Sequence, residues 1–183
     1  DGEISGYAST FGLPADSHGH VIQAGAFKRG LKELESEGIS PAMLWAHRRD
    51  QPIGKWIEVR ENSKGLYVRG RINKEVQAGR EALALIQAGD INGLSIGVMV
   101  AEGGRAYDSS SGIWTLTDLH LMEVSVVTFP ANKRARLARP KQIDSKSDLV
   151  DLLRDGGLSK SYASRVAAGG WPAVTGKDHP KAL

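Results

Sequence analysis

Residues 93–101 read GLSIGVMVA, which sets Ser95 between two glycines at the start of an apolar run. This run and a second one at residues 121–129, which stops at Pro130, have the valine-rich composition of β-strands. A helical pattern precedes them at residues 75–87 and ends at Gly89. A Gly-Ser-rich loop, expected at residues 102–112, and one more strand-like segment separate the two runs, so the sequence predicts several antiparallel strands here.

The first part of the chain continues this pattern. Further strands are expected at residues 4–10, 43–47, 56–61, 66–72 and 113–119. A polar loop is expected at residues 11–20, and a helix at residues 26–37 with Phe27, Leu31 and Leu34 on one face. Many strands with only two helices favour an α+β fold dominated by strands. We expect an antiparallel β-barrel or curled sheet with peripheral helices.

The chain has room for one substantial core and an appendage, since it holds 183 residues of which 40% are hydrophobic. We assign residues 1–138 to one domain and residues 139–183 to a linker and a C-terminal helical tail. Helices are expected at residues 146–154 and 159–168, the second ended by Gly169 and Gly170. Acidic and basic side chains balance in residues 1–138, so the tail carries the whole formal excess of +3.

The residues His47, Ser95 and Glu123 are the minimum set for a serine hydrolase. A serine hydroxyl is a weak nucleophile at neutral pH, so it needs an imidazole in reach and a third group that orients the imidazole. The G-x-S-x-G pattern also marks the nucleophile of the α/β-hydrolases, where a strand precedes the serine and a helix follows it. Here that order is reversed, which argues against an α/β-hydrolase.

From about residue 4 to residue 135, six segments resemble the prohead (capsid maturation) proteases of tailed phages related to HK97, which are similar to the herpesvirus assemblins. The segments are GYAS at 6–9, GAF at 25–27, His47 with PIG at 52–54, GLYV at 65–68, GLSIG at 93–97, and EVSVV at 123–127 with PAN at 130–132. Their order and spacing make the resemblance specific. It implies an assemblin-like barrel and a serine endopeptidase.

The resemblance implies a role for each candidate catalytic residue. His47 is the general base, Ser95 the nucleophile and Glu123 the group that orients His47. Assemblins use a second histidine as the third member, and His120 lies three residues before Glu123, on the opposite face of a regular strand. We choose Glu123 because the phage pattern places the acid directly before Val-Ser-Val. Backbone N–H groups near Gly97 or Asn132 are the expected oxyanion donors.

Each candidate also has a structural explanation. His47 can be an ordinary histidine at a strand end, and Ser95 a small residue in a crowded strand. Glu123 lies inside an apolar run, where a buried carboxylate needs a partner, either His47 or an arginine. His18 and His20 form a loop pair without a third ligand, so we expect no metal site.

The resemblance implies cleavage of capsid and scaffold polypeptides in the host cytoplasm, inside the immature capsid, without a metal or organic cofactor. Self-cleavage, and a homodimer or higher assembly, are further expectations. The chain has no cysteine and no apolar run near the ~18 residues of a membrane span. One alternative is a noncatalytic module that binds scaffold or capsid protein. Another is DNA binding through a helix-turn-helix in the tail, although the mild charge argues against a nucleic-acid partner.

Overall fold

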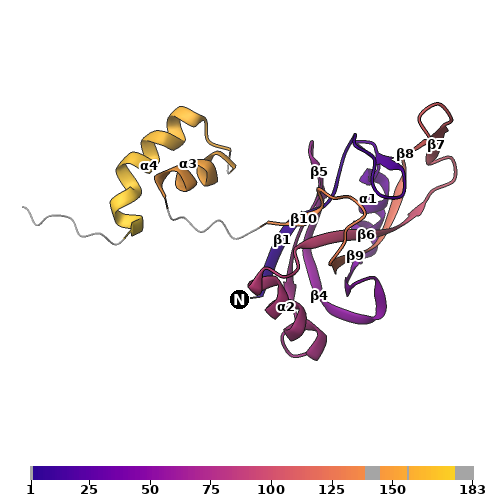
Figure 1. The fold of residues 1–183 in the computed structure, drawn as a ribbon, viewed down its shortest axis with the longest axis horizontal. Coiled ribbons are helices and arrows are strands. Elements are labelled where there is room, and N and C mark those ends of the chain that lie inside the picture. The colour runs from indigo at the N-terminus through magenta and orange to yellow at the C-terminus, as the bar shows by residue number, and fades with distance from the viewer. Residues whose placement is uncertain (1, 139–144, 156, 176–183) are drawn as a thin grey trace, which may run out of the picture. The chain divides into compact units, whose positions relative to one another are not determined.

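The computed structural model describes residues 2–138, 145–155 and 157–175 (Figure 1). The chain clusters into two compact units, residues 1–138 and residues 139–183. Within the described residues, the first unit holds all the strands and two helices, whereas the second holds two helices.

The first unit is built on a closed barrel with the strand order β1-β10-β6-β9-β3-β4-β5. The strands are β1 (Glu3–Thr10), β3 (Ala42–Trp45), β4 (Arg48–Glu61), β5 (Gly65–Ile72), β6 (Gly93–Val100), β9 (Leu119–Val127) and β10 (Arg136–Leu137). Neighbouring strands run antiparallel except β3 and β9, which are parallel. The α+β fold dominated by a β-barrel is therefore confirmed.

A second sheet of three short strands accompanies the barrel, in the order β2 (His20–Ile22), β8 (Ile113–Leu116) and β7 (Arg105–Asp108). In β7 and β8, Tyr107 and Trp114 face each other with ring centroids 4.9 Å apart, and the Arg105 guanidinium lies over the Trp114 ring. The hairpin of β7 and β8 projects from the body of the unit (Figure 1).

Two helices pack on the barrel. The first, α1 (Lys28–Glu37), contacts β9 and β4, and the second, α2 (Gln77–Ala88), contacts β4 and β5. Both end at a glycine in the left-handed conformation, Gly38 and Gly89, a conformation that a residue without Cβ adopts at little cost.

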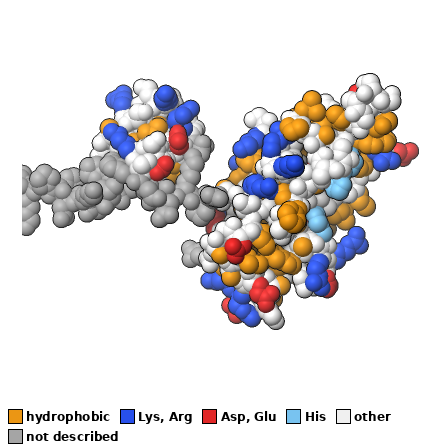
Figure 2. Space-filling model, in the orientation of Figure 1, with side chains coloured by type: hydrophobic (Ala, Val, Ile, Leu, Met, Phe, Trp, Pro, Cys, Tyr) orange, Lys and Arg blue, Asp and Glu red, His pale blue; other side chains and the backbone are white. Residues whose placement is uncertain are grey.

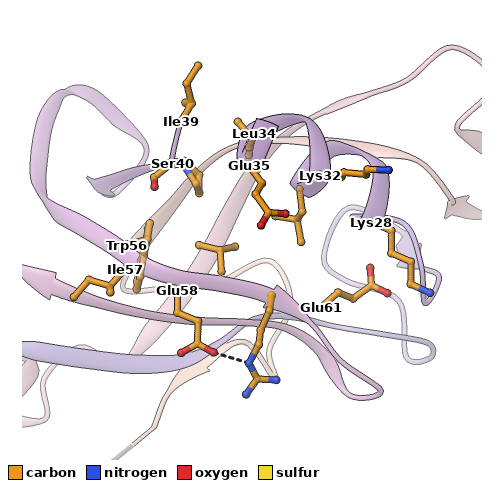
Figure 3. Close-up of a pocket in the computed structure, with 14 residues that line it drawn as sticks. Lys28, Lys32, Leu34, Glu35, Ile39, Ser40, Trp56, Ile57, Glu58 and Glu61 are labelled. Carbon is orange, nitrogen blue, oxygen red and sulfur yellow. Dashed lines mark hydrogen bonds and ion pairs between the residues drawn. The ribbon is translucent and has the colours of Figure 1, made fainter. Parts of the chain in front are cut away.

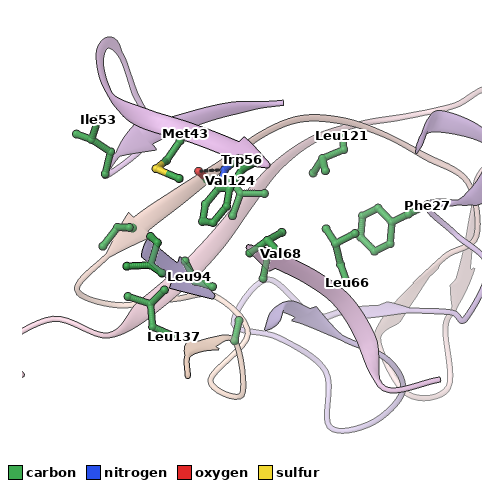
Figure 4. Packing of buried hydrophobic residues seen from close by; sticks show 14 of the residues in the cluster. Phe27, Met43, Ile53, Trp56, Leu66, Val68, Leu94, Leu121, Val124 and Leu137 are labelled. Atoms are coloured by element: carbon green, nitrogen blue, oxygen red, sulfur yellow. Dashed lines mark hydrogen bonds between the residues drawn. The ribbon is translucent and has the colours of Figure 1, made fainter. Parts of the chain in front are cut away.

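The core lies inside the barrel, where side chains from strands on different sides meet (Figure 4). Met43, Val68, Leu94 and Val124 are buried there. The Trp56 indole packs among them and donates its N–H to the backbone oxygen of Val124 at 3.2 Å, so its one polar group is satisfied. This hydrogen bond and the packing around it tie β4 to β9 across the core.

Several elements differ from the sequence-based expectation. The loop expected at residues 11–20 ends in β2, and β7 lies in the segment expected to be a loop at residues 102–112. The strand expected at residues 56–61 begins eight residues earlier, at Arg48. β2, β7 and β10 are two to four residues long, which is too short for a periodic pattern. They are recognised as strands only through their hydrogen-bonded pairing with neighbouring strands.

The second unit contains α3 (Lys146–Asp155) and α4 (Lys160–Thr175). Ser145 begins α3 with a reciprocal cap: its hydroxyl accepts the Asp148 N–H at 3.1 Å, and its own N–H donates to the Asp148 carboxylate at 2.8 Å. Leu149, Ala163 and Ala167 are buried between the two helices.

The expectation that Gly169 and Gly170 end the last helix was wrong, because α4 continues to Thr175. A glycine costs a helix only about 1 kcal/mol relative to alanine, so a glycine pair weakens a helix without stopping it. The polar linker expected after residue 138 lies mostly outside the described residues. Within the described part of the chain, no helix is long and apolar enough to cross a membrane.

Candidate functional site

The candidate residues come from adjacent strands of the barrel. In the antiparallel pair of β6 and β9, Ser95 lies opposite Ser125 and Gly97 lies opposite Glu123. Directly paired residues share a face of a sheet, and so do residues two apart on one strand. Ser95, Glu123 and Ser125 therefore project from the same face.

His47 reaches this face through the turn between β3 and β4. Trp45 pairs with Arg48, so Ala46 and His47 form a two-residue turn, with φ of 49° and 63°. Positive φ at both central positions is the type I′ pattern, which usually selects glycine or asparagine. The expected strand at residues 43–47 is thus two residues too long.

Hydrogen bonds to β9 hold this unusual turn. The Ala46 N–H donates to the Val126 backbone oxygen at 3.0 Å. The His47 N–H donates to the Ser125 hydroxyl, also at 3.0 Å. Non-glycine residues persist in the left-handed region only where the surroundings fix them. These contacts place the imidazole beside the middle of β9.

The His47 imidazole and the Glu123 carboxylate form a short pair, with Nδ1 and Oε1 2.7 Å apart. The other carboxylate oxygen, Oε2, accepts the Ser125 hydroxyl at 2.6 Å. Glu123 is only 9% exposed, so both oxygens need partners, and both have one. Among the described residues, these partners are His47 and Ser125, and no arginine contacts the carboxylate. Of the two explanations of the buried carboxylate, the structure favours the histidine.

Ser95 and His47 line one cavity of about 230 Å³, together with Ser9, Ile96, Leu116 and Asn132. Ser95 is 9% exposed, whereas the His47 side chain is 47% exposed at the rim. The described residues show no hydrogen bond between the Ser95 hydroxyl and the imidazole. Such bonds are often long until a substrate completes the site. Histidine side chains reach the surface on the face of the barrel unit in Figure 2.

A larger hollow of about 540 Å³ lies between α1 and β4 (Figure 3). Its lining mixes apolar side chains, including Ile39, Trp56 and Ile57, with charged ones such as Lys28 and Glu58. It contains no histidine and none of the three candidate residues. The smaller cavity is therefore the one with the chemistry of a hydrolase.

His120 belongs to a different cluster, between α1 and β9. Its Nδ1 lies 3.0 Å from the Glu33 carboxylate and its Nε2 lies 3.0 Å from the Arg29 guanidinium. Arg29 also binds Asp118, and this hydrogen bond raises the pKa of Arg29. His120 thus ties α1 to the start of β9, and Glu123 is the residue that contacts His47.

His18 and His20 also line the cavity that contains Ser95, with ring centroids 5.9 Å apart. The Asp16 carboxylate accepts the backbone N–H groups of both. No group of three or more histidine, cysteine, aspartate or glutamate side chains suited to a metal ion occurs in the described part of the chain.

The Asn132 side chain forms hydrogen bonds with two segments that border the cavity. Its amide nitrogen donates to the Thr10 backbone oxygen at 3.2 Å, and its oxygen accepts the Arg134 N–H at 3.0 Å. It thereby joins the end of β1 to the segment that follows β9. The donors of the oxyanion hole stay a prediction.

Gly97 is a site residue whose role the sequence did not reveal. The Glu123 side chain crosses directly over it, and a Cβ at this position would overlap Oε1, Cγ and Cδ of that carboxylate. A glycine opposite a functional acid is the only signal that could have pointed to this role, and it is visible only once the register of β6 and β9 is known.

We expect Gly97→Ala to displace the Glu123 carboxylate and to lower hydrolytic activity roughly 100-fold, the loss typical of a 1 Å misplacement in an active site. The rate of labelling by a fluorophosphonate measures this. Gly169→Ala in α4 is the control, since it also replaces a glycine, has no atom near its Cβ position and has no left-handed backbone that an alanine would strain. Equal rates for Gly97→Ala and wild type would show that Glu123 is not needed in this position.

Comparison with known proteins shows the family to which the chain belongs. The family model described as caudovirus prohead serine protease matches residues 1–148. The prohead protease of Enterobacteria phage HK97 is 36% identical over 172 residues, which cover 91% of this chain and 74% of that protein. The prohead protease of Escherichia phage T5 is 32% identical over 131 residues, covering 72% of this chain and 59% of that protein.

Solved structures share the fold at low sequence identity. The bacteriophage T4 capsid assembly protease gp21 superposes with a TM-score of 0.57 at 17% identity, covering 70% of this chain and 82% of that one. The KSHV protease in complex with a hexapeptide phosphonate inhibitor gives 0.50 at 12% identity, covering 87% and 78%. The predicted resemblance is confirmed: this chain belongs to the caudovirus prohead serine protease family, and it is a serine protease of capsid maturation.

Proposed function

We propose that Ser95, His47 and Glu123 are the catalytic triad of this protease. The observation that carries the proposal is the His47–Glu123 pair, 2.7 Å between Nδ1 and Oε1, at the rim of the cavity that also contains Ser95. Because Nδ1 is occupied by the carboxylate, Nε2 is the ring nitrogen left to accept a proton from the serine.

The reaction then follows from these positions. The Ser95 oxygen attacks the peptide carbonyl while His47 Nε2 takes the hydroxyl proton, and the carbonyl π electrons move to the oxygen. His47 returns the proton to the leaving amine as the C–N bond breaks, which leaves an acyl-enzyme. Water, activated by the same imidazole, hydrolyses the ester. Glu123 holds the ring in the required tautomer and stabilises the imidazolium.

The substrates that fit this assignment are capsid and scaffold polypeptides, cleaved inside the immature capsid within the host cell. Support comes from the relatives, which are named as prohead proteases in phages HK97 and T5 and as a capsid assembly protease in phage T4. We also propose that the enzyme cuts its own chain and acts as a homodimer or a higher assembly. No metal or organic cofactor takes part in the steps above.

The direct test is labelling of the protein by a fluorophosphonate, which reacts with activated serines, followed by intact-mass and peptide analysis. We expect one adduct per chain on Ser95 in the wild type and no adduct in Ser95→Ala. Ser63→Ala removes an exposed serine in the turn between β4 and β5, and it should label like the wild type. An adduct on another serine, or labelling of Ser95→Ala, would overturn the assignment of the nucleophile.

A further inference from the structure

Ser125 is the least exposed polar residue near the site. Its exposed fraction is 0%, and it lies on β9 between β6 and β3, opposite Ser95 on one side and Leu44 on the other. A hydroxyl in such a position must be hydrogen-bonded or it destabilises the core. Its partners show what it does.

The Ser125 hydroxyl closes a ring of hydrogen bonds with both proposed partners of Ser95. It donates its single proton to Glu123 Oε2 at 2.6 Å and accepts the His47 backbone N–H at 3.0 Å. His47 in turn contacts Glu123 Oε1 through Nδ1 at 2.7 Å. The buried Ser125 oxygen therefore holds both the Glu123 carboxylate and the His47 backbone in place.

The two contacts restrain two movements that would disrupt the site, rotation of the Glu123 carboxylate and a change of the His47 backbone. A carboxylate with one free oxygen can rotate about its last bond and take Oε1 away from the imidazole, and the Ser125 proton prevents this. The His47 backbone has a φ of 63°, a conformation that a non-glycine residue leaves unless neighbouring groups hold it. Neither restraint requires Ser125 to touch the substrate.

We propose that Ser125 is a positioning residue, which acts on the reaction only through Glu123 and His47. The inference rests on the proposed triad and adds a fourth side chain to it. Groups that orient a functional residue often contribute as strongly as a direct contact, because displacements near 1 Å lower rates about 100-fold.

The expected effect of Ser125→Ala is a loss of about 100-fold in the maximal rate of fluorophosphonate labelling, with the half-saturating probe concentration nearly unchanged. Ser125→Thr keeps the hydroxyl and should recover part of the rate. Val124→Ala is the stability control. It opens a cavity at the neighbouring residue of β9, whose side chain faces the barrel core, and should label as fast as the wild type well below its unfolding temperature.

A double-mutant cycle separates positioning from general damage. If Ser125 acts through Glu123, then Ser125→Ala should cost little when Glu123 is already alanine, so the two losses should not multiply. Full multiplication of the losses would exclude the route through Glu123 and leave only the contact with the His47 backbone, and a wild-type labelling rate in Ser125→Ala would overturn the proposal.

A spectroscopic measurement keeps this inference distinct from the assignment of the nucleophile. The His47 Nδ1 proton, held against Glu123, should give a downfield proton NMR signal in the wild type and in Ser95→Ala. We expect Ser125→Ala to lose or broaden it through exchange with water. If Ser95 proves not to be the nucleophile but the signal depends on Ser125, the triad fails and the positioning role stands. A signal that survives Ser125→Ala unchanged contradicts the positioning role whatever Ser95 does.

Discussion

Replacing His47 by alanine is expected to lower the rate of peptide cleavage and of fluorophosphonate labelling by about a million-fold, the loss seen when the base of a serine protease triad is removed. His47 lines the cavity of Ser95 and lies 2.7 Å from the Glu123 carboxylate. His20 also lines this cavity, but it lies 4.0 Å from its nearest carboxylate, that of Asp16. Without it the Ser95 hydroxyl has no acceptor for its proton.

His120→Ala is the matched control for this prediction. His120 also lies against a glutamate, with its Nδ1 3.0 Å from Glu33, yet it serves as a link between α1 and β9. We expect it to change stability by no more than about 1 kcal/mol, as for a partly exposed pair, and to leave the labelling rate intact. If His120→Ala removed activity and His47→Ala did not, the general base would have been assigned to the wrong histidine.

Glu123→Gln is expected to reduce the same rates by about 10⁴-fold, the effect of an amide in place of the triad acid. The glutamine side chain has nearly the same shape, so the change removes charge and hydrogen-bond direction rather than volume. An amide NH₂ turned towards Nδ1 would hold the proton of the imidazole on Nε2, where it blocks transfer from Ser95.

The second glutamate-histidine pair again supplies the control. Glu33→Gln makes the identical chemical change beside His120 and should leave the labelling rate at the wild-type level. Mass spectrometry of the labelled proteins, followed over time, gives both rates in one experiment. Equal rates for Glu123→Gln and Glu33→Gln would contradict the assignment of Glu123 to the triad.

The sequence predicted most of the long strands of the barrel because valine-rich runs such as residues 93–101 and 121–129 carry a strong local signal, but it missed the first eight residues of β4. It could not predict that β3 and β9 are parallel, since that pairing depends on chain closure over long separations. The sequence also did not predict the short strands β2, β7 and β10. β2 and β10 are held by partners distant in the sequence. β7 pairs with the neighbouring strand β8, but its four residues are all exposed and carry no alternating pattern.

The candidate site shows the same division between local and long-range information. The order of His47, Ser95 and Glu123 pointed to hydrolase chemistry, and the structure brings His47 and Glu123 into contact. The turn at Ala46 and His47 carries neither glycine nor asparagine, so its left-handed backbone had no local signal. The roles of Gly97 and Ser125 depend on the register of β6 and β9, which no single strand encodes.

β10 sets a limit on how the protease can be processed. Arg136 and Leu137 join β1 to β6, and the Ala138 N–H donates to the Ser5 backbone oxygen at 2.7 Å, so the last residues of the first unit complete the cylinder. A cut before Arg136 would remove β10 and leave β1 and β6 with unpaired edges. A cut after Ala138 would detach the helical tail and leave the barrel closed. Proteolytic trimming from the C-terminal side can therefore leave the barrel closed only if it cuts after Ala138.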